Sequence, residues 1–226
     1  MKKINFSRPS DSFFTHIFAR SVSVHLTPVV AKTSITPLQV TILGLIIGLF
    51  AACIGSVSGW AYGILAAILI ELSHILDCVD GELARLTGKG NPFAASLDPI
   101  SDRIKDTAVI IAAFIQGTLV SPFGLSDSTI AFVALITMGL WLCYMYIVDA
   151  FLNPARRKLL PSITNKRIYI GLYDLFVYGS IFFWLTNQFE YFLFFVLVLA
   201  SFGVVIQILR LKKILMLDQV PFNREK

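Results

Sequence analysis

Residues 65–85, LAAILIELSHILDCVDGELAR, pass within one helix length from an almost wholly apolar sequence to one rich in acids. The second half holds Asp77 and Asp80, and another pair, Asp98 and Asp102, follows a short polar stretch. A carboxylate at membrane depth costs about 2.5–3.5 kcal/mol on insertion scales, so four of them need a compensating positive charge. The pattern therefore predicts a membrane protein with an acidic site at adjoining helix ends, and a divalent metal ion is the best counter-charge.

The composition of the whole chain agrees with a membrane setting. Hydrophobic residues make up 56% of the 226 residues and charged residues 15%. Six apolar runs approach the roughly 20 residues that a helix needs to cross a bilayer, namely 38–57, 60–76, 107–120, 130–152, 168–185 and 191–209. The second and third become long enough only if their helices continue through the aspartates. We therefore predict an all-α integral membrane protein with six transmembrane helices.

The chain is expected to form one domain over residues 1–226, because no internal repeat, low-complexity tract or linker interrupts it. A cytoplasmic arm (1–35) precedes a six-helix core (36–212) and a cytoplasmic tail (213–226). Within the arm, apolar side chains recur at helical spacing and favour an amphipathic interfacial helix; they are Phe13, Phe14, Ile17 and Phe18. A disordered arm is the alternative. Thr36 and Pro37 suit the cap and first position of the first spanning helix.

The basic residues indicate the orientation of the chain. All 19 Lys and Arg residues lie in four segments, 1–35, 85–105, 156–167 and 210–226, and the alternate loops have none. Basic residues are retained on the cytoplasmic side, so both termini and the aspartates are expected there, in a multi-pass protein of the cell (inner) membrane. Because the charge is divided among juxtamembrane segments, contact with the lipid bilayer explains the net charge of +5 better than a nucleic acid does.

The spacing of the aspartates predicts a shared site. Members of each pair are three or four residues apart, which places them on one helix face. Gly88, Gly90 and Pro92 lie between the pairs and predict a turn that brings the two helix ends together. Oxygen ligands favour Mg²⁺ or Mn²⁺, whereas the three cysteines without paired spacing and the scarcity of histidine disfavour zinc or iron. Gly81 allows a ligand close to the backbone, and Arg85 can bind a phosphate.

These residues resemble the signature of the CDP-alcohol phosphotransferase family, D-x-x-D-G-x-x-A-R, then eight residues, then G-x-x-x-D-x-x-x-D. Seven of the eight defined positions match: Asp77, Asp80, Gly81, Ala84, Arg85, Asp98 and Asp102. The exception is Ala94, where the family has glycine. A motif of this length is far more specific than a lone glycine-rich loop. The six-span topology of the family extends the resemblance to nearly the whole chain.

The resemblance implies an enzyme that transfers a phosphoalcohol group, foremost phosphatidyl, from a CDP-alcohol such as CDP-diacylglycerol to a polar alcohol or alcohol phosphate. CMP is released, and the product serves phospholipid or related phosphodiester synthesis. Asp77, Asp80 and Asp98 would be metal ligands, and Asp102 both a ligand and the base that takes the acceptor's proton. The family implies two ions of Mg²⁺ or Mn²⁺ and a homodimer.

The resemblance also implies substrate contacts. The donor contacts map to Thr36, Pro37, Gln39, Gly81, Ala84, Arg85 and Asn91. Leu38 stands where relatives commonly have asparagine, and the neighbouring Gln39 is expected to replace that contact. Arg167 and Lys105 are the expected acceptor contacts. Relatives with a phosphorylated acceptor often have a basic pair after the tyrosine at this position, and none follows Tyr146. The sequence therefore does not distinguish between inositol phosphate, glycerol phosphate and a neutral alcohol as the acceptor.

Two alternatives compete with this interpretation. A divalent-cation transporter or channel could use the aspartates, although transporters place acids near the bilayer midplane, often on broken helices. The aspartates could also form a structural salt-bridge network with Arg85, Arg103 and Lys105. Asp106 is expected to orient Lys105 or Arg85. His74 is expected to form an interhelical hydrogen bond, with acceptor binding or a proton path as its alternative.

Overall fold

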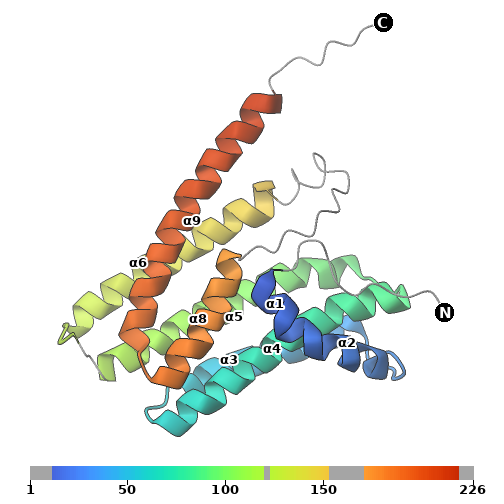
Figure 1. Ribbon diagram of the computed structural model, residues 1–226, viewed down its shortest axis with the longest axis horizontal. Helices are drawn as coiled ribbons and strands as arrows, with labels where there is room; N and C mark the ends of the chain where they lie inside the picture. The colour runs from blue at the N-terminus through green and yellow to red at the C-terminus, as the bar shows by residue number, and fades with distance from the viewer. Residues whose placement is uncertain (1–11, 120–122, 153–170, 219–226) are drawn as a thin grey trace, which may run out of the picture.

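The computed structural model describes residues 12–119, 123–152 and 171–218, and all regular elements in these ranges are helical (Figure 1). Two short helices, α1 (Phe13–Ile17) and α2 (Ala19–Val30), precede α3 (Pro37–Gly55), α4 (Trp60–Thr87) and α5 (Pro92–Leu119). Helix α6 (Asp127–Ile147) continues into the π-helix η1 (Val148–Leu152), and α8 (Leu172–Thr186) and α9 (Phe189–Asp218) follow. The predicted all-α class is confirmed for this part of the chain.

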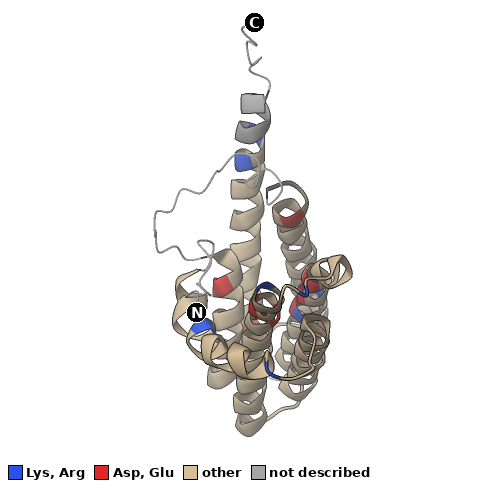
Figure 2. Cartoon of the chain, turned by 90° about the vertical axis from the view of Figure 1, so that its right-hand side faces the viewer, with Lys and Arg blue, Asp and Glu red and all other residues tan. Residues whose placement is uncertain are grey.

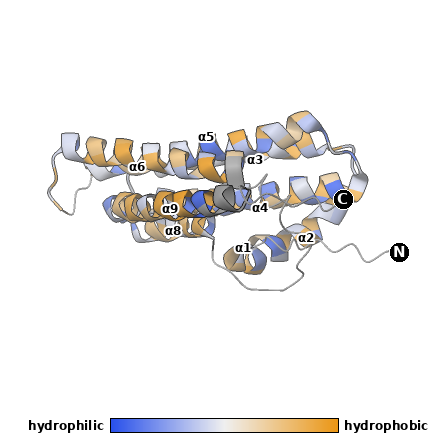
Figure 3. Cartoon of the chain, turned by 90° about the horizontal axis from the view of Figure 1, so that it is seen from above, coloured by the Kyte–Doolittle hydropathy of each residue, from blue (hydrophilic) through white to orange (hydrophobic). Residues whose placement is uncertain are grey.

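Four helical segments within the described ranges are long and apolar enough to cross a membrane: Pro37–Gly55, Trp60–Thr87, Asp127–Ala150 and Phe189–Lys212. Helix α8 is apolar but has only 15 residues. Helix α5 has 28 residues, and its first half carries several charged side chains. Figure 3 shows apolar residues along most of α6, α8 and α9. The membrane character is confirmed, and the count of six spans stays a prediction.

Local sequence explains where the site-bearing helices begin and end. The Oγ1 atom of Thr36 accepts from the amide of Gln39 at 3.3 Å, and Oε1 of Gln39 accepts from the amide of Thr36 at 2.9 Å. This reciprocal capping box, followed by Pro37, opens α3 as predicted. Gly88 ends α4 in the left-handed region (φ 66°), which glycine adopts without a steric penalty. The predicted turn is confirmed, and α4 and α5 continue through the aspartates as expected.

Packing of the long helices brings the ends of α4 and α5 together. Helix α3 packs against both α4 and α5, α4 also contacts α8, and α6 packs against α9. Large aromatic side chains fill the core between them, and the rings of Trp141 and Phe176 stack at 4.4 Å. Because α3 contacts both helices along its length, the acidic faces of α4 and α5 are held side by side.

The segment before α3 is helical, so the interpretation as a disordered arm is wrong for residues 13–30. It forms two helices, with Phe18 at the break. The exposed side chains of α2 include the apolar Val22 (48%) and Val29 (59%) beside the polar Ser21 and His25, while Ser23 and Thr27 are fully buried. Ser23 and Thr27 therefore turn toward α4, where both bind Glu82. The interfacial position of this segment stays a prediction.

Candidate active site

Three of the predicted metal ligands lie together where α4 and α5 meet. One carboxylate oxygen each of Asp77, Asp98 and Asp102 lies within 4.8 Å of the other two, and these residues are called the aspartate trio below. Figure 2 shows that charged positions occupy few turns of otherwise uncharged helices. Oδ1 of Asp98 is buried and has no hydrogen-bond partner among the described residues. Three partly buried carboxylates at this separation repel one another unless a cation lies between them.

Asp80, the fourth predicted ligand, is not part of the aspartate trio and contacts α3. Its Oδ2 atom accepts a hydrogen bond from Oγ1 of Thr41 at 2.5 Å. The side chain is buried and forms part of the wall of a large cavity, which it shares with Asp98. The structure therefore brings three predicted ligands to one point and places the fourth beside them. The ligand role of all four stays a prediction.

Two basic side chains of α5 partly neutralise the aspartate trio. Nζ of Lys105 lies 2.9 Å from Oδ1 of Asp102 and 3.7 Å from Oδ1 of Asp77. Arg103 lies 3.7 Å from both Asp102 and Asp106. Asp106 was expected to orient Lys105 or Arg85. Its Oδ2 atom accepts a hydrogen bond from Nε1 of Trp141 at 2.9 Å. The salt-bridge alternative thus describes part of the environment of Asp102, while Asp98 has no ion pair within the described residues.

A cavity of about 650 Å³ opens beside the aspartate trio. Residues of α3, α4, α5 and the turn between the last two form its wall: Pro37, Thr41, Asp80, Gly81, Ala84, Arg85, Gly90, Asn91, Pro92, Ala94, Ala95 and Asp98. The volume is in the range of sites that hold ligands of drug or nucleotide size. Five of the seven predicted donor contacts line this cavity. The other two, Thr36 and Gln39, form the capping box next to Pro37.

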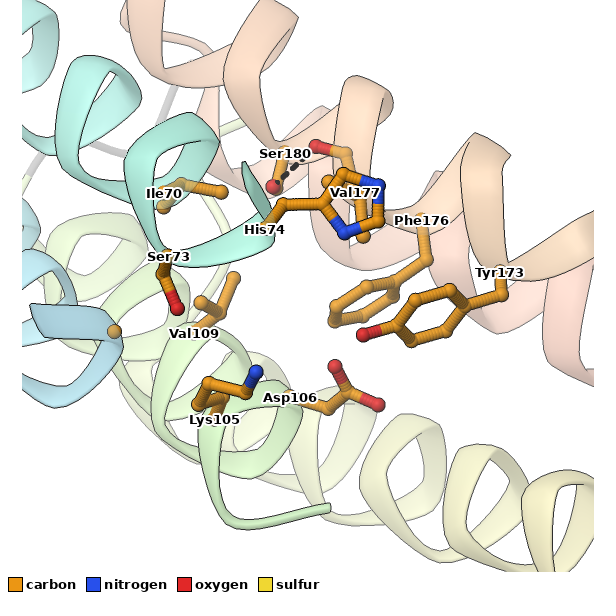
Figure 4. A pocket seen from close by; sticks show the side chains of 11 residues that line it. Ile70, Ser73, His74, Lys105, Asp106, Val109, Tyr173, Phe176, Val177 and Ser180 are labelled. Carbon is orange, nitrogen blue, oxygen red and sulfur yellow. Dashed lines mark hydrogen bonds between the residues drawn. The ribbon is translucent and has the colours of Figure 1, made fainter. Parts of the chain in front are cut away.

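A second cavity of about 40 Å³ is lined in part by Lys105 (Figure 4). Its polar lining includes Ser73 and His74 of α4 and Tyr173 of α8. This is room for a water molecule rather than a substrate. His74 forms a hydrogen bond with Thr15 of α1 at 3.2 Å, so the predicted interhelical bond is confirmed.

The expected acceptor contact Arg167 lies outside the described residues, and Lys105 lies at the aspartate trio. Two polar contacts were not anticipated. Thr41 binds Asp80, and the wholly buried Glu82 binds side chains of α2. A glutamate directly after Gly81 in an otherwise apolar helix was the available signal for the second contact, and nothing in the sequence marked Thr41.

A sequence profile of the CDP-alcohol phosphatidyltransferase family matches residues 34–186. The match covers more than half of the chain and includes the aspartate trio and the large cavity. The chain therefore belongs to the CDP-alcohol phosphatidyltransferase family.

Among similar proteins, archaetidylinositol phosphate synthase of Pyrococcus horikoshii is 37% identical over 87 residues, which are 38% of this chain and 45% of the relative. The bifunctional IPC transferase and DIPP synthase of Aquifex aeolicus is 33% identical over 102 residues, which are 45% of this chain and 23% of the relative. The chain therefore spans less than half the length of these curated relatives.

Solved structures show the same fold. Mycobacterium tuberculosis phosphatidylinositol phosphate synthase with CDP-DAG bound has a TM-score of 0.58 and 20% identity, over 83% of this chain and 92% of that one. The same synthase in complex with manganese and citrate has a TM-score of 0.59 and 21% identity, over 91% and 93% of the two chains. At this identity the likeness establishes the fold and not the substrates.

Proposed function

We propose that this protein transfers a phosphoalcohol group from a CDP-alcohol to the hydroxyl of a polar alcohol or alcohol phosphate and releases CMP. One observation carries the proposal: Asp98 of the aspartate trio lines a 650 Å³ cavity that Gly81 and Arg85 of the family signature also line. The CDP-DAG in a structural neighbour supports CDP-diacylglycerol as donor. A transporter finds no support in the family or in the neighbours.

The side chains present fit a divalent metal ion. All candidate ligands are carboxylate oxygens, which suit Mg²⁺ and Mn²⁺, and Oδ1 of Asp98 is buried without a hydrogen bond in the described structure. Asp77, Asp98 and Asp102 would hold the metal, with Asp80 as a further ligand if two ions bind. When bound, the metal neutralises the diphosphate and the negative charge that develops during transfer. Manganese in a structural neighbour supports this assignment.

The protein's own groups would then align the reactants. Arg85 would bind the diphosphate through its planar guanidinium, and Asn91 and Pro37 would contact the nucleotide within the same cavity. The carboxylate of Asp102 would accept the proton of the acceptor hydroxyl. The acceptor oxygen then forms a bond to the phosphorus that carries the alcohol, and the bond from that phosphorus to the oxygen of CMP breaks, so CMP leaves with the electron pair.

Lys105 and Arg167 would contact the acceptor. The names of the relatives refer to inositol phosphate lipids, which makes inositol phosphate the first acceptor to test, before glycerol phosphate and neutral polyols. The basic side chain of Lys105 at the aspartate trio supports a phosphorylated acceptor, because an ammonium group binds phosphate as a point charge.

The proposed arrangement in the membrane has six spans, both termini and the active site in the cytoplasm, and the inner membrane as location. Helices α5 and α8 would supply the two spans beyond the four long apolar segments. With 28 residues, α5 is roughly 42 Å long at 1.5 Å per residue, so it is long enough to cross a bilayer when the turns that carry the aspartates are counted as part of the span. One domain over 1–226, with its core in 36–212, would form a homodimer.

The experiment that tests this function is release of CMP by the purified protein. CDP-diacylglycerol is supplied with inositol phosphate, glycerol phosphate, inositol or glycerol, in the presence of Mg²⁺, Mn²⁺ or a chelator. We expect CMP only with an acceptor and a metal ion. Absence of CMP with every acceptor and both ions, in protein that remains folded, would rule the proposal out.

A further inference from the structure

We infer that Glu82 is a positioning residue for the large cavity and acts through three side chains of α2. The inference rests on the proposed function in one respect, namely that the cavity holds the CDP-alcohol donor. Glu82 is 0% exposed and lies on α4 directly after Gly81. It belongs to neither the aspartate trio nor the lining of the cavity.

The carboxylate of Glu82 accepts hydrogen bonds on both oxygens from donors on one helix face. Oε1 accepts from Nη1 of Arg20 at 2.5 Å and from Oγ of Ser23 at 2.7 Å, and Oε2 accepts from Oγ1 of Thr27 at 2.5 Å. The donors are three and four residues apart, so they share one face of α2. They are called, with Glu82, the Glu82 cluster. A single side chain of α4 thereby fastens two turns of α2.

The Glu82 cluster lies at the segment of α4 that forms the active site. Nη1 of Arg20 also donates to the carbonyl oxygen of Cys78 at 3.4 Å, and Cys78 follows Asp77 directly. On the other faces of the same turns, Asp80, Gly81 and Arg85 line the large cavity. Motion of this part of α4 would therefore displace a ligand candidate and the phosphate-binding arginine together.

The end of α4 needs such support. The helix stops at Thr87, and the last turn of a helix has carbonyl groups without intrahelical partners and frays easily. Apolar contacts already pack α2 on α4, through Leu26 and Val30 against buried Val79 and Leu83. A buried ion pair adds little stability over such packing, whereas its directional bonds define one alignment of the two helices. The Glu82 cluster is therefore best explained by alignment.

The test compares Glu82→Gln with Glu190→Gln in the full-length protein. Glu190 is a control for burial because it is 1% exposed, accepts from the amide of Phe123 at 3.2 Å and lies in the first turn of α9, outside the cavity lining; its Oε1 atom has no partner in the described structure. Three quantities are measured: melting temperature, amide hydrogen exchange of residues 80–88, and KM and kcat for CDP-diacylglycerol. Glu82→Gln is expected to lower the melting temperature, because it weakens the ion pair with Arg20 and the hydrogen bonds from Ser23 and Thr27.

Only Glu82→Gln is expected to speed exchange in residues 80–88, by about tenfold or more, because local opening of that helix end becomes easier. The same variant is expected to raise the donor KM about tenfold, the effect of losing a hydrogen bond to a charged group, with kcat within about threefold. The double variant with Arg20→Leu and Glu82→Leu replaces the ion pair by an apolar pair of side chains. Its melting temperature should return toward that of the wild type, while its KM for the donor should stay raised. If Glu82→Gln does not fold, Ser23→Ala and Thr27→Val each remove one donor and serve as milder variants.

Unchanged exchange in residues 80–88 together with an unchanged donor KM would overturn the inference, whatever the melting temperature. Recovery of the donor KM by the apolar pair would also overturn it, since packing alone would then be sufficient. Failure of the wild-type protein to release CMP would instead reject the proposed function, and hydrogen exchange would still decide whether the Glu82 cluster holds the end of α4.

Discussion

Helix α4 carries two acidic sites five residues apart, and they differ in how well their charge is satisfied. Glu82 has donors on both carboxylate oxygens, all from α2. Asp77 instead lies within 4.8 Å of two further carboxylates, and the nearest cation to it, Lys105, is 3.7 Å away. The first site is complete within the protein, and the second has more negative charge than the neighbouring side chains neutralise.

The difference separates a structural acid from a binding site. A buried carboxylate that already has a cation partner and donors on both oxygens gains little from an added cation, because existing hydrogen bonds would have to be replaced. A group of carboxylates with an unpaired buried oxygen, as at Asp98, is stabilised by a cation from solution. The comparison predicts that metal ions and variants act differently at the two sites.

Removal of metal is expected to have the largest effect. Chelation should reduce CMP release to background, and Mn²⁺ should restore it. Mn²⁺ at 100 times its dissociation constant stabilises a protein by about 2.7 kcal/mol, so thermal denaturation should shift upward in the wild type. The shift should persist in Glu82→Gln and vanish in Asp98→Asn. Equal loss of the shift in both variants would contradict the distinction between the two sites.

Asp102→Asn is expected to lower kcat by about 10³-fold, since a positioned general base contributes about 10²–10⁴-fold. The amide keeps the size of the side chain but cannot take the acceptor's proton. Asp149→Asn is the control, because Asp149 pairs with Arg103 at 3.4 Å from outside the aspartate trio. That control should remain within about threefold of wild type, as partly exposed ion pairs contribute little. A variant at position 102 with more than a tenth of wild-type kcat would argue against the assigned base.

Thr41→Val is expected to have an intermediate effect. It removes the 2.5 Å hydrogen bond to Asp80 with almost no change of shape. A hydrogen bond to a charged group contributes about 1.5–3 kcal/mol, so the dissociation constant for Mn²⁺ or the donor KM should rise about tenfold. Thr118→Val, which removes only a bond to the carbonyl of Ile115, should change neither. Calorimetric titration with Mn²⁺ distinguishes the two variants.

Ala94→Gly is expected to have the smallest effect. It restores the residue of the family signature at a buried position of the cavity wall. Added backbone freedom should cost less than about 1 kcal/mol of stability, and the donor KM should change by no more than about threefold. A much larger fall in KM would show that the alanine methyl group obstructs the donor.

The sequence was most informative where one residue type has one physical use. Thr36 before Pro37 predicted the start of α3, and Gly88 predicted the end of α4, because few residues suit those backbone positions. The shortness of the second and third apolar runs predicted that α4 and α5 would continue through the aspartates. The sequence could not show that Thr41 meets Asp80, because the two residues belong to different helices and are 39 positions apart.

The N-terminal segment shows the same limit. Apolar spacing predicted a helix there, and the helix exists, but spacing cannot tell which face meets the protein. In water the apolar face would be buried. Here Ser23 and Thr27 are buried beside the packed Leu26 and Val30, and Val29 is exposed, because the polar side chains find hydrogen-bond partners on α4.

By itself the sequence determined the membrane setting, the helical class, the helix ends and the group of acids that defines the family, because these depend on composition and on local spacing. Only the tertiary structure decided which acids remain short of positive charge and which are satisfied. That distinction separates the aspartate trio from Glu82, and it depends on donors from other helices, which approach only when the chain has packed.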